Sequence, residues 1–565
     1  MDLSFFEGRD KKIKALEASD DAAGLESPKG DLKSFLFFIL AYAVLLLIFC
    51  NFVSSVPIGN YWWDYLALKG IEVQMFAGSA NIRELWLPFM LPIWLLKASN
   101  LISGYGVDYF VAHVLIGAAT FALTYQPVFS RLPKRFAVCI YLLLLVFSVV
   151  PVALDFTFFS FADANAVAYH GFYNRYMDVI YCFLVLSFWV KKEKESFSVA
   201  VFWSFALVVA LLTKLSYFVV FLALLWANVL SERSRPALVS CIVGAGAAAG
   251  LYLLWPNYFE TVWNIVLVRG LAPLLKWEVL AALAGVAGVL LSVCFYLMKK
   301  EIRIFLFASL PLLSSIALSS GNVGDLQPLR LAFALALPVF VYRSELRSSK
   351  LILERERSAK KSIRWGMSLY FSALLVISLM MVRPVLVVMK TAMITGTAIF
   401  AHEAGLRSEF VEFRNIKGFF SHAYYLPQSL RHLLDMREFS VSEYGSNGWH
   451  KAGFFILYAR EMDKTLSYVS QFRNDKISWF SFPGLVPQIY GVGRIPEGAW
   501  PWYLYGHEIS RSYHPDFLAI NAESRVAVVD ECYWSGKELL ENFGDEIRIK
   551  SRIIFKSACF TVYGD

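Results

Sequence analysis

The feature that most constrains this chain is a series of long apolar runs between Ser34 and Met389. A helix that crosses a bilayer needs about 20 mostly apolar residues, and runs that fit one recur about eleven times. Only 17% of the residues are charged, and 58% are hydrophobic. Soluble domains carry about 25% charged residues. We therefore expect a polytopic α-helical membrane protein with spans at roughly 34–54, 107–127, 135–153, 174–190, 197–212, 214–230, 237–255, 277–298, 303–320, 329–342 and 366–389.

Two stretches depart from this regular pattern. The apolar stretch 197–230 is too long for one ordinary span, and its single charged residue is Lys214. We divide the stretch into two spans at that residue. The shorter apolar stretch 86–96 contains Pro88 and Pro92, and we interpret it as an interfacial segment.

The distribution of basic residues predicts the orientation of the spans, because loops rich in Lys and Arg stay in the cytoplasm. A cytoplasmic tail at 1–33 puts five short basic connections inside, at 131–135, 191–195, 231–235, 299–303 and 343–364. The outside connections hold few basic residues for their length; they are 55–106, 154–173, the Lys214 turn, 256–276 and 321–328. The net charge of +8 is thus a feature of topology and predicts no nucleic-acid partner.

An odd number of spans over 34–389 places residues 390–565 outside the cytoplasm. We expect this segment to be a soluble α/β or α+β domain. Its β-branched runs predict strands at 525–531, 547–555 and 558–563, and 426–436 is predicted to be a helix. The cysteines of this segment, Cys532 and Cys559, form either a disulfide, as an oxidising compartment allows, or two buried thiols.

Ionisable residues beside the predicted spans gather towards their outer ends. Such residues are costly near a bilayer and are functional-site candidates by default. Two outside loops hold acids: 57–79, with Asp64 after a pair of tryptophans, and 153–179. A partly desolvated carboxylate is a stronger base. We assign Asp64, Asp155 and Asp163 as candidate catalytic residues.

Cations at the same outer ends suit a phosphate group, which accepts charge-assisted hydrogen bonds. One carboxylate with such a phosphate clamp provides what sugar transfer from a lipid phosphate requires. Arg175 and Asp178 are also spaced to pair with each other on one helix. The candidate substrate-binding residues are Trp63, His170, Asn174, Arg175, Lys214, Arg330 and Arg383.

The order of these features resembles the GT-C superfamily of membrane glycosyltransferases. The likeness rests on the early acid Asp64, the second acidic outside loop, the multi-span body, the outside C-terminal domain, and the stretch Tyr169–Arg175. The resemblance implies an inverting transfer from a polyprenyl-phosphate sugar to an extracytoplasmic lipid, glycan or protein, with Asp64 as the base. Many members have two adjacent acids, whereas Tyr65 follows Asp64 here. The second acid is then Asp155 or Asp163, which orients the acceptor or helps to bind a divalent metal, Mg²⁺ or Mn²⁺.

The resemblance further implies a multi-pass protein of a bacterial inner membrane with an extracytoplasmic C-terminal domain. Two other hypotheses fit the same composition. One is a transporter or flippase for a lipid-linked glycan, which places its site near the middle of the membrane. The other is a non-catalytic assembly protein whose outside domain binds a partner.

Overall fold

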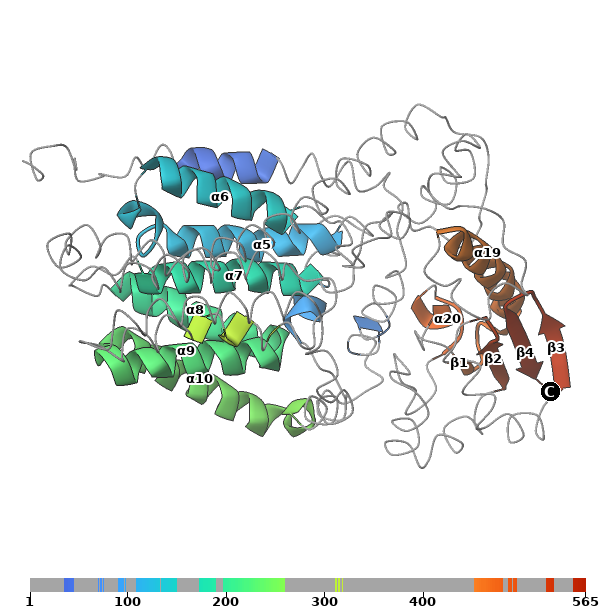
Figure 1. Ribbon diagram of the computed structural model, residues 1–565. Coiled ribbons are helices and arrows are strands. Elements are labelled where there is room, and N and C mark those ends of the chain that lie inside the picture. Colours follow the sequence, from blue (N-terminus) through green and yellow to red (C-terminus); the bar gives the residue numbers. More distant parts are fainter. Residues whose placement is uncertain are drawn as a thin grey trace, which may run out of the picture.

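The computed structural model describes part of the chain in two groups of elements, a helical bundle and a small sheet with its helices (Figure 1). The described residues are 35–44, 70, 72–73, 75, 90–95, 97, 108–132, 134–149, 172–189, 197–259, 310–311, 313–315, 318, 452–480, 486–489, 491–494, 525–532 and 552–564.

The main helices of the bundle begin and end within a few residues of the predicted apolar runs. Leucine and alanine, which are frequent in them, are strong helix formers, and long apolar runs satisfy their backbone polar groups internally when they are helical. These helices are α5 (Asp108–Thr124), α6 (Lys134–Val149), α7 (Phe172–Trp189), α8 (Phe197–Thr213), α9 (Leu215–Glu232) and α10 (Arg235–Leu254).

Hydrogen bonds between side chains and neighbouring helices show that consecutive helices run in opposite directions. The Tyr141 hydroxyl donates to Thr124 O over 3.0 Å, which places the middle of α6 beside the end of α5, from which the chain has just turned back. The Trp203 Nε1 donates to Ser187 Oγ over 2.7 Å, which places the start of α8 beside the end of α7. The bundle is therefore an up-and-down arrangement, as alternating spans require.

The helices α8 and α10 run in the same direction, with α9 returning between their ends. Ser240 Oγ donates to Ala200 O over 3.1 Å near their starts. Gly244 lies farther along, where a Cβ atom would stand 2.8 Å from Leu207 Cδ1. Glycine at this position lets α8 and α10 approach closely.

The predicted division of the stretch 197–230 at Lys214 is confirmed. Lys214 has an extended backbone with φ −160° and ψ 116°, which cannot continue a helix. Its N–H donates to Ala210 O over 2.8 Å, and its carbonyl accepts from Tyr217 N over 3.0 Å. A single residue thus ends one helix and begins the next.

One described helix, α10, is long and apolar enough to cross a membrane, with 20 residues and a mean hydropathy of 2.0. Three shorter apolar helices accompany it at Phe35–Val44, Phe197–Thr213 and Leu215–Leu230. The length and composition of these helices are the only basis for this statement. The predicted spans at 277–298, 329–342 and 366–389 lie outside the described residues, so the predicted number of spans stays a prediction.

The described C-terminal part contains a four-stranded sheet with the order β1-β2-β4-β3 (Figure 1). Its strands are β1 (Ile477–Phe480), β2 (Val526–Asp530), β3 (Arg552–Lys556) and β4 (Phe560–Gly564). β1 and β2 are parallel, whereas β4 is antiparallel to both β2 and β3. The three predicted strands overlap with β2, β3 and β4, and the predicted helix 426–436 lies outside the described residues.

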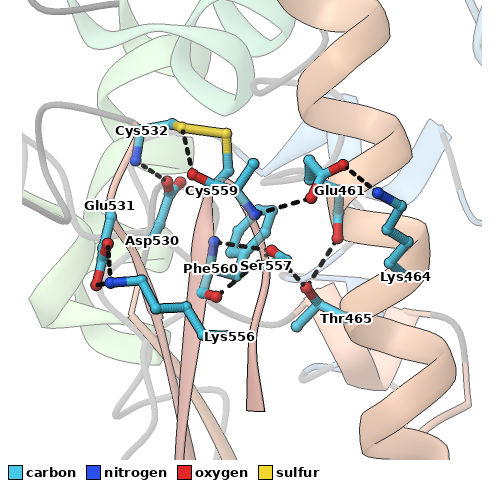
Figure 2. Close-up of a disulfide and its surroundings, with 11 residues drawn as sticks. Glu461, Lys464, Thr465, Asp530, Glu531, Cys532, Lys556, Ser557, Cys559 and Phe560 are labelled. Carbon is cyan, nitrogen blue, oxygen red and sulfur yellow. Dashed lines mark hydrogen bonds and ion pairs between the residues drawn. A yellow bond between two sulfur atoms is a disulfide. The ribbon is translucent and has the colours of Figure 1, made fainter. Parts of the chain in front are cut away.

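The helix α19 (Ala452–Val469) packs against β3 and β4, and the short helix α20 (Val486–Ile489) lies beside β1. The Tyr468 hydroxyl of α19 donates to Ile554 O over 3.0 Å. Cys532 and Cys559 form a disulfide, with their Cα atoms 4.9 Å apart, which decides between the two alternatives left by the sequence. Figure 2 shows this disulfide beside Glu461 of α19.

Candidate functional site

Polar side chains from the first turns of α7 meet the corner between α8 and α9. Lys214 Nζ donates to Asn174 Oδ1 over 3.3 Å, and the Tyr217 hydroxyl donates to Asp178 Oδ1 over 2.6 Å. We refer to these four residues together with Arg175 as the polar corner. Its residues come from α7, from α9 and from Lys214. Lys214 is the only residue between α8 and α9, so the end of α8 lies at the same place.

A third bond, between the hydroxyl groups of Tyr176 and Thr213, fixes α7 against the end of α8 over 2.9 Å. Three residues of α7 therefore bond to residues around one tight turn. Their partners there are Lys214, Thr213 and Tyr217. A helix pair joined by one residue has little freedom to shift. The position of Lys214 relative to α7 is therefore well determined.

The ionisable groups of the polar corner are largely removed from solvent. Arg175 is 1% exposed and Asp178 is 0% exposed, while Lys214 is partly buried. Lys214 Nζ also lies 5.8 Å from the centroid of the Tyr173 ring, a cation–π distance. Burying such charges costs free energy, and this cost makes the polar corner the strongest candidate site among the described residues.

Other segments reach the same end of the bundle. Met90 N donates to Leu212 O over 2.9 Å, and the Tyr258 hydroxyl donates to Leu211 O over 2.6 Å. Both bonds satisfy carbonyls in the last turn of α8, which lack helical partners. Burial raises the pKa of Tyr258, so its hydroxyl keeps the proton that it donates. Residues of three predicted outside connections therefore lie at one end of the bundle.

The structure brings two of the predicted substrate-binding residues into contact, Asn174 and Lys214, and a third, Arg175, follows Asn174 on α7. Tyr217 was not among the predicted residues, and its only sequence signal is its place in the helical turn after Lys214. Asp178 was recognised as a potential partner of Arg175, and its bond to Tyr217 is new. The remaining predicted residues lie outside the described part of the chain: Asp64, Asp155, Asp163, Trp63, His170, Arg330 and Arg383.

The polar corner suits an anion better than a metal ion. It combines a guanidinium, an ammonium and an amide, and its single carboxylate accepts a hydrogen bond from Tyr217. Among the described residues, no group of three or more His, Cys, Asp or Glu side chains could hold a metal. The metal suggested by the family resemblance would involve Asp155 or Asp163, which lie outside those residues.

Comparison with known protein families finds none that matches this chain, and none of the curated proteins is significantly similar to it. The GT-C resemblance thus stays an expectation from architecture and the motifs around Asp64 and Tyr169–Arg175.

Proposed function

We propose that this chain is an integral membrane glycosyltransferase of the GT-C type. It transfers a sugar with inversion from a polyprenyl-phosphate donor to an extracytoplasmic lipid, glycan or protein. The observation that carries the proposal is the polar corner, where Lys214 and Asn174 are in contact beside the buried Arg175. Two cations on neighbouring elements at the end of a bundle fit the phosphate of a lipid donor.

The proposed chemistry assigns the polar corner to the leaving group. The acceptor oxygen forms a bond to the anomeric carbon, and the bond from that carbon to the phosphate oxygen breaks. Asp64 takes the proton of the acceptor hydroxyl. Arg175 and Lys214 stabilise the negative charge that develops on the departing polyprenyl phosphate.

The other predicted residues complete the proposed site. His170, Arg330 and Arg383 extend the phosphate clamp, and Trp63 contacts the substrate. Asp155 or Asp163 orients the acceptor or helps to bind a divalent metal.

The disulfide supports the proposed orientation in the membrane. Disulfides persist in the oxidising periplasm and are rare in the cytoplasm. The bond between Cys532 and Cys559 favours an extracytoplasmic C-terminal domain, as the basic loops do. In this orientation, the polar corner faces the same side as that domain.

The place of the buried charges favours an enzyme over a transporter. Among the described residues of α5 to α10, the buried arginine and aspartate lie within the first two turns of α7. Transporters generally bind their substrates near the middle of the membrane. A lipid phosphate instead lies at the membrane surface, where the ends of helices are.

The proposal is tested by sugar transfer in membranes that contain the protein and a radiolabelled polyprenyl-phosphate sugar. Asp64→Asn should lower transfer at least about 100-fold, because a general base contributes that much or more. Full transfer by this variant would refute the assignment of the base. If joint substitution of Asp64, Asp155 and Asp163 left the phenotype of the cells unchanged, the assembly-protein hypothesis would be favoured. Movement of the intact sugar donor across vesicle membranes would favour the flippase hypothesis.

The role of the polar corner is tested separately by binding of a polyprenyl phosphate that carries no sugar. Lys214→Ala should weaken binding about tenfold, as expected for one charge-assisted hydrogen bond. Lys556→Ala is the matched control, because Lys556 is a lysine on β3 with a side chain 58% exposed. Equal binding by the two variants would show that the polar corner does not bind the donor.

A further inference from the structure

A groove lies between the end of α5 and the start of α8, at the opposite end of the bundle from the polar corner. It encloses about 450 Å³ and is largely apolar. From the α5 side it is lined by Ala122, Leu123 and Gln126, and from the α8 side by Phe197, Ser198 and Val201. We propose that this groove binds an anionic phospholipid, with an acyl chain between the helices and the phosphate at the rim. The inference rests on the membrane placement proposed above.

The walls of the groove suit a hydrocarbon chain. Leu123 and Val201 come from helices that are packed against each other. Phe197 begins α8 and is 84% exposed, an unusual state for a large aromatic residue in water. A lipid chain along the groove would cover part of this ring, and about 25 cal/mol is gained for each Å² of apolar surface covered.

A basic residue follows the lining residue Gln126 closely along the chain. The chain turns back after Gln126, because Ser130 Oγ donates to Gln126 O over 2.8 Å and Ser130 N donates to Tyr125 O over 2.9 Å. This compact turn continues into the short helix η2 (Phe129–Arg131). Arg131 therefore follows directly after Ser130, the residue that is bonded back to Tyr125 and to the lining residue Gln126.

The start of α8 adds a second positive feature at the rim. The N-terminal end of a helix carries a partial positive charge from its aligned peptide dipoles, and α8 is 17 residues long. Ser198, a lining residue, lies in its first turn. Together, Arg131 and this helix end are complementary to a lipid phosphate that bears a net negative charge, more than to a zwitterionic head group.

The position of the groove matches the leaflet in which anionic lipids gather. The alternation of the helices puts this end on the cytoplasmic side, beside the predicted inside connections 131–135 and 191–195. Anionic lipids of that leaflet attract basic residues near the surface, by about 1 kcal/mol for each Lys or Arg. The groove thus combines an apolar lining with a basic residue nearby in the sequence, and the predicted topology places it in the leaflet that holds anionic lipids.

The test uses the full-length protein, purified in detergent and stripped of lipid, and native mass spectrometry with added phosphatidylglycerol or phosphatidylcholine. Phosphatidylglycerol should bind better. Arg131→Gln should weaken its binding about fivefold, and Ala122→Trp, which fills the groove, should weaken it for both lipids. The matched controls are Arg235→Gln and Ala245→Trp, exposed positions on α10 that do not line the groove.

Each outcome of this test has a distinct meaning. Equal retention of the two lipids, or binding by Ala122→Trp equal to that of Ala245→Trp, would overturn the groove as a site for an anionic lipid. Release of the protein from cell membranes by alkaline carbonate would overturn the membrane placement and this inference with it. Loss of transfer activity in Asp64→Asn bears only on the proposed function, because Asp64 belongs to the predicted loop 57–79.

Discussion

Tyr217 donates a 2.6 Å hydrogen bond to Asp178, and both side chains are fully buried. The bond joins the first turn of α9 to the second turn of α7. A buried carboxylate without sufficient hydrogen bonds is strongly destabilising. This bond is therefore a structural requirement of the polar corner as well as a link between helices.

Removal of the Tyr217 hydroxyl should destabilise the bundle. Tyr217→Phe keeps the ring but takes a donor from the Asp178 carboxylate, which costs about 1–3 kcal/mol. The measurement is thermal unfolding of the purified protein in detergent. Tyr252→Phe is the matched control, because Tyr252 lies on α10 and is 56% exposed. Equal melting temperatures for the two variants would show that the bond contributes little.

Enlargement of Gly244 should disturb the contact between α8 and α10. A Cβ atom there would lie 2.8 Å from Leu207 Cδ1 and 3.5 Å from Phe218 Cε2, so Gly244→Leu should cost about 1–3 kcal/mol through overpacking. Gly246→Leu is the control, since no atom beyond the helix's own nearby backbone lies within 4 Å of a Cβ at that position. It should leave stability unchanged or raise it slightly, because leucine has the higher helix propensity. Similar losses for both variants would argue against this packing.

The disulfide should contribute to the stability of the sheet region. The two cysteines are separated by 27 positions, and closure of a loop of that length contributes about 3.5 kcal/mol. Joint replacement of Cys532 and Cys559 by alanine should increase proteolysis of the C-terminal domain in isolated membranes. Maleimide labelling provides the check, because both thiols should react only after reduction. Cys139→Ala serves as the control, since Cys139 is an exposed free cysteine on α6.

Glu461 should matter more to the C-terminal domain than the surface ion pair between Lys556 and Glu531. Glu461 Oε2 accepts a 2.9 Å bond from Ala558 N, next to the disulfide (Figure 2). Glu461→Ala leaves that N–H without its acceptor and should cost about 1–3 kcal/mol. Lys556→Ala removes a pair whose side chains are 58% and 30% exposed, which is worth about 1 kcal/mol at most. Limited proteolysis compares the two variants, and the reverse order of sensitivity would contradict this prediction.

The helices of the bundle were predictable because their lengths and their apolar content leave few other structures available. The break at Lys214 was predictable for the same reason, since one charged residue interrupts a stretch too long for a single span. The strand β2 falls within the predicted strand 525–531, because alternate packing on a sheet favours β-branched residues. Local composition was sufficient for each of these features.

The contacts of the candidate site were only partly predictable. Asn174, Arg175 and Lys214 were identified because polar groups at the ends of apolar helices are costly and stand out in the sequence. Their proximity to Asp64, Asp155 and Asp163 stays a prediction, because those acids lie outside the described residues. The bond from Tyr217 to Asp178 had no sequence signal, since a tyrosine among apolar residues equally suits a packed core.

The sequence by itself determined which described segments of the bundle are helical, where the long stretch 197–230 divides, and which ends of these helices carry charge, whereas it did not predict the helix α19. Only the tertiary structure decided that Tyr217 meets Asp178 and that Cys532 pairs with Cys559. The physical reason is that helix formation depends on neighbours a few residues away, whereas those pairs depend on how whole elements are rotated and stacked. That rotation is fixed by contacts such as the close approach of Gly244 to Leu207, which no local pattern specifies.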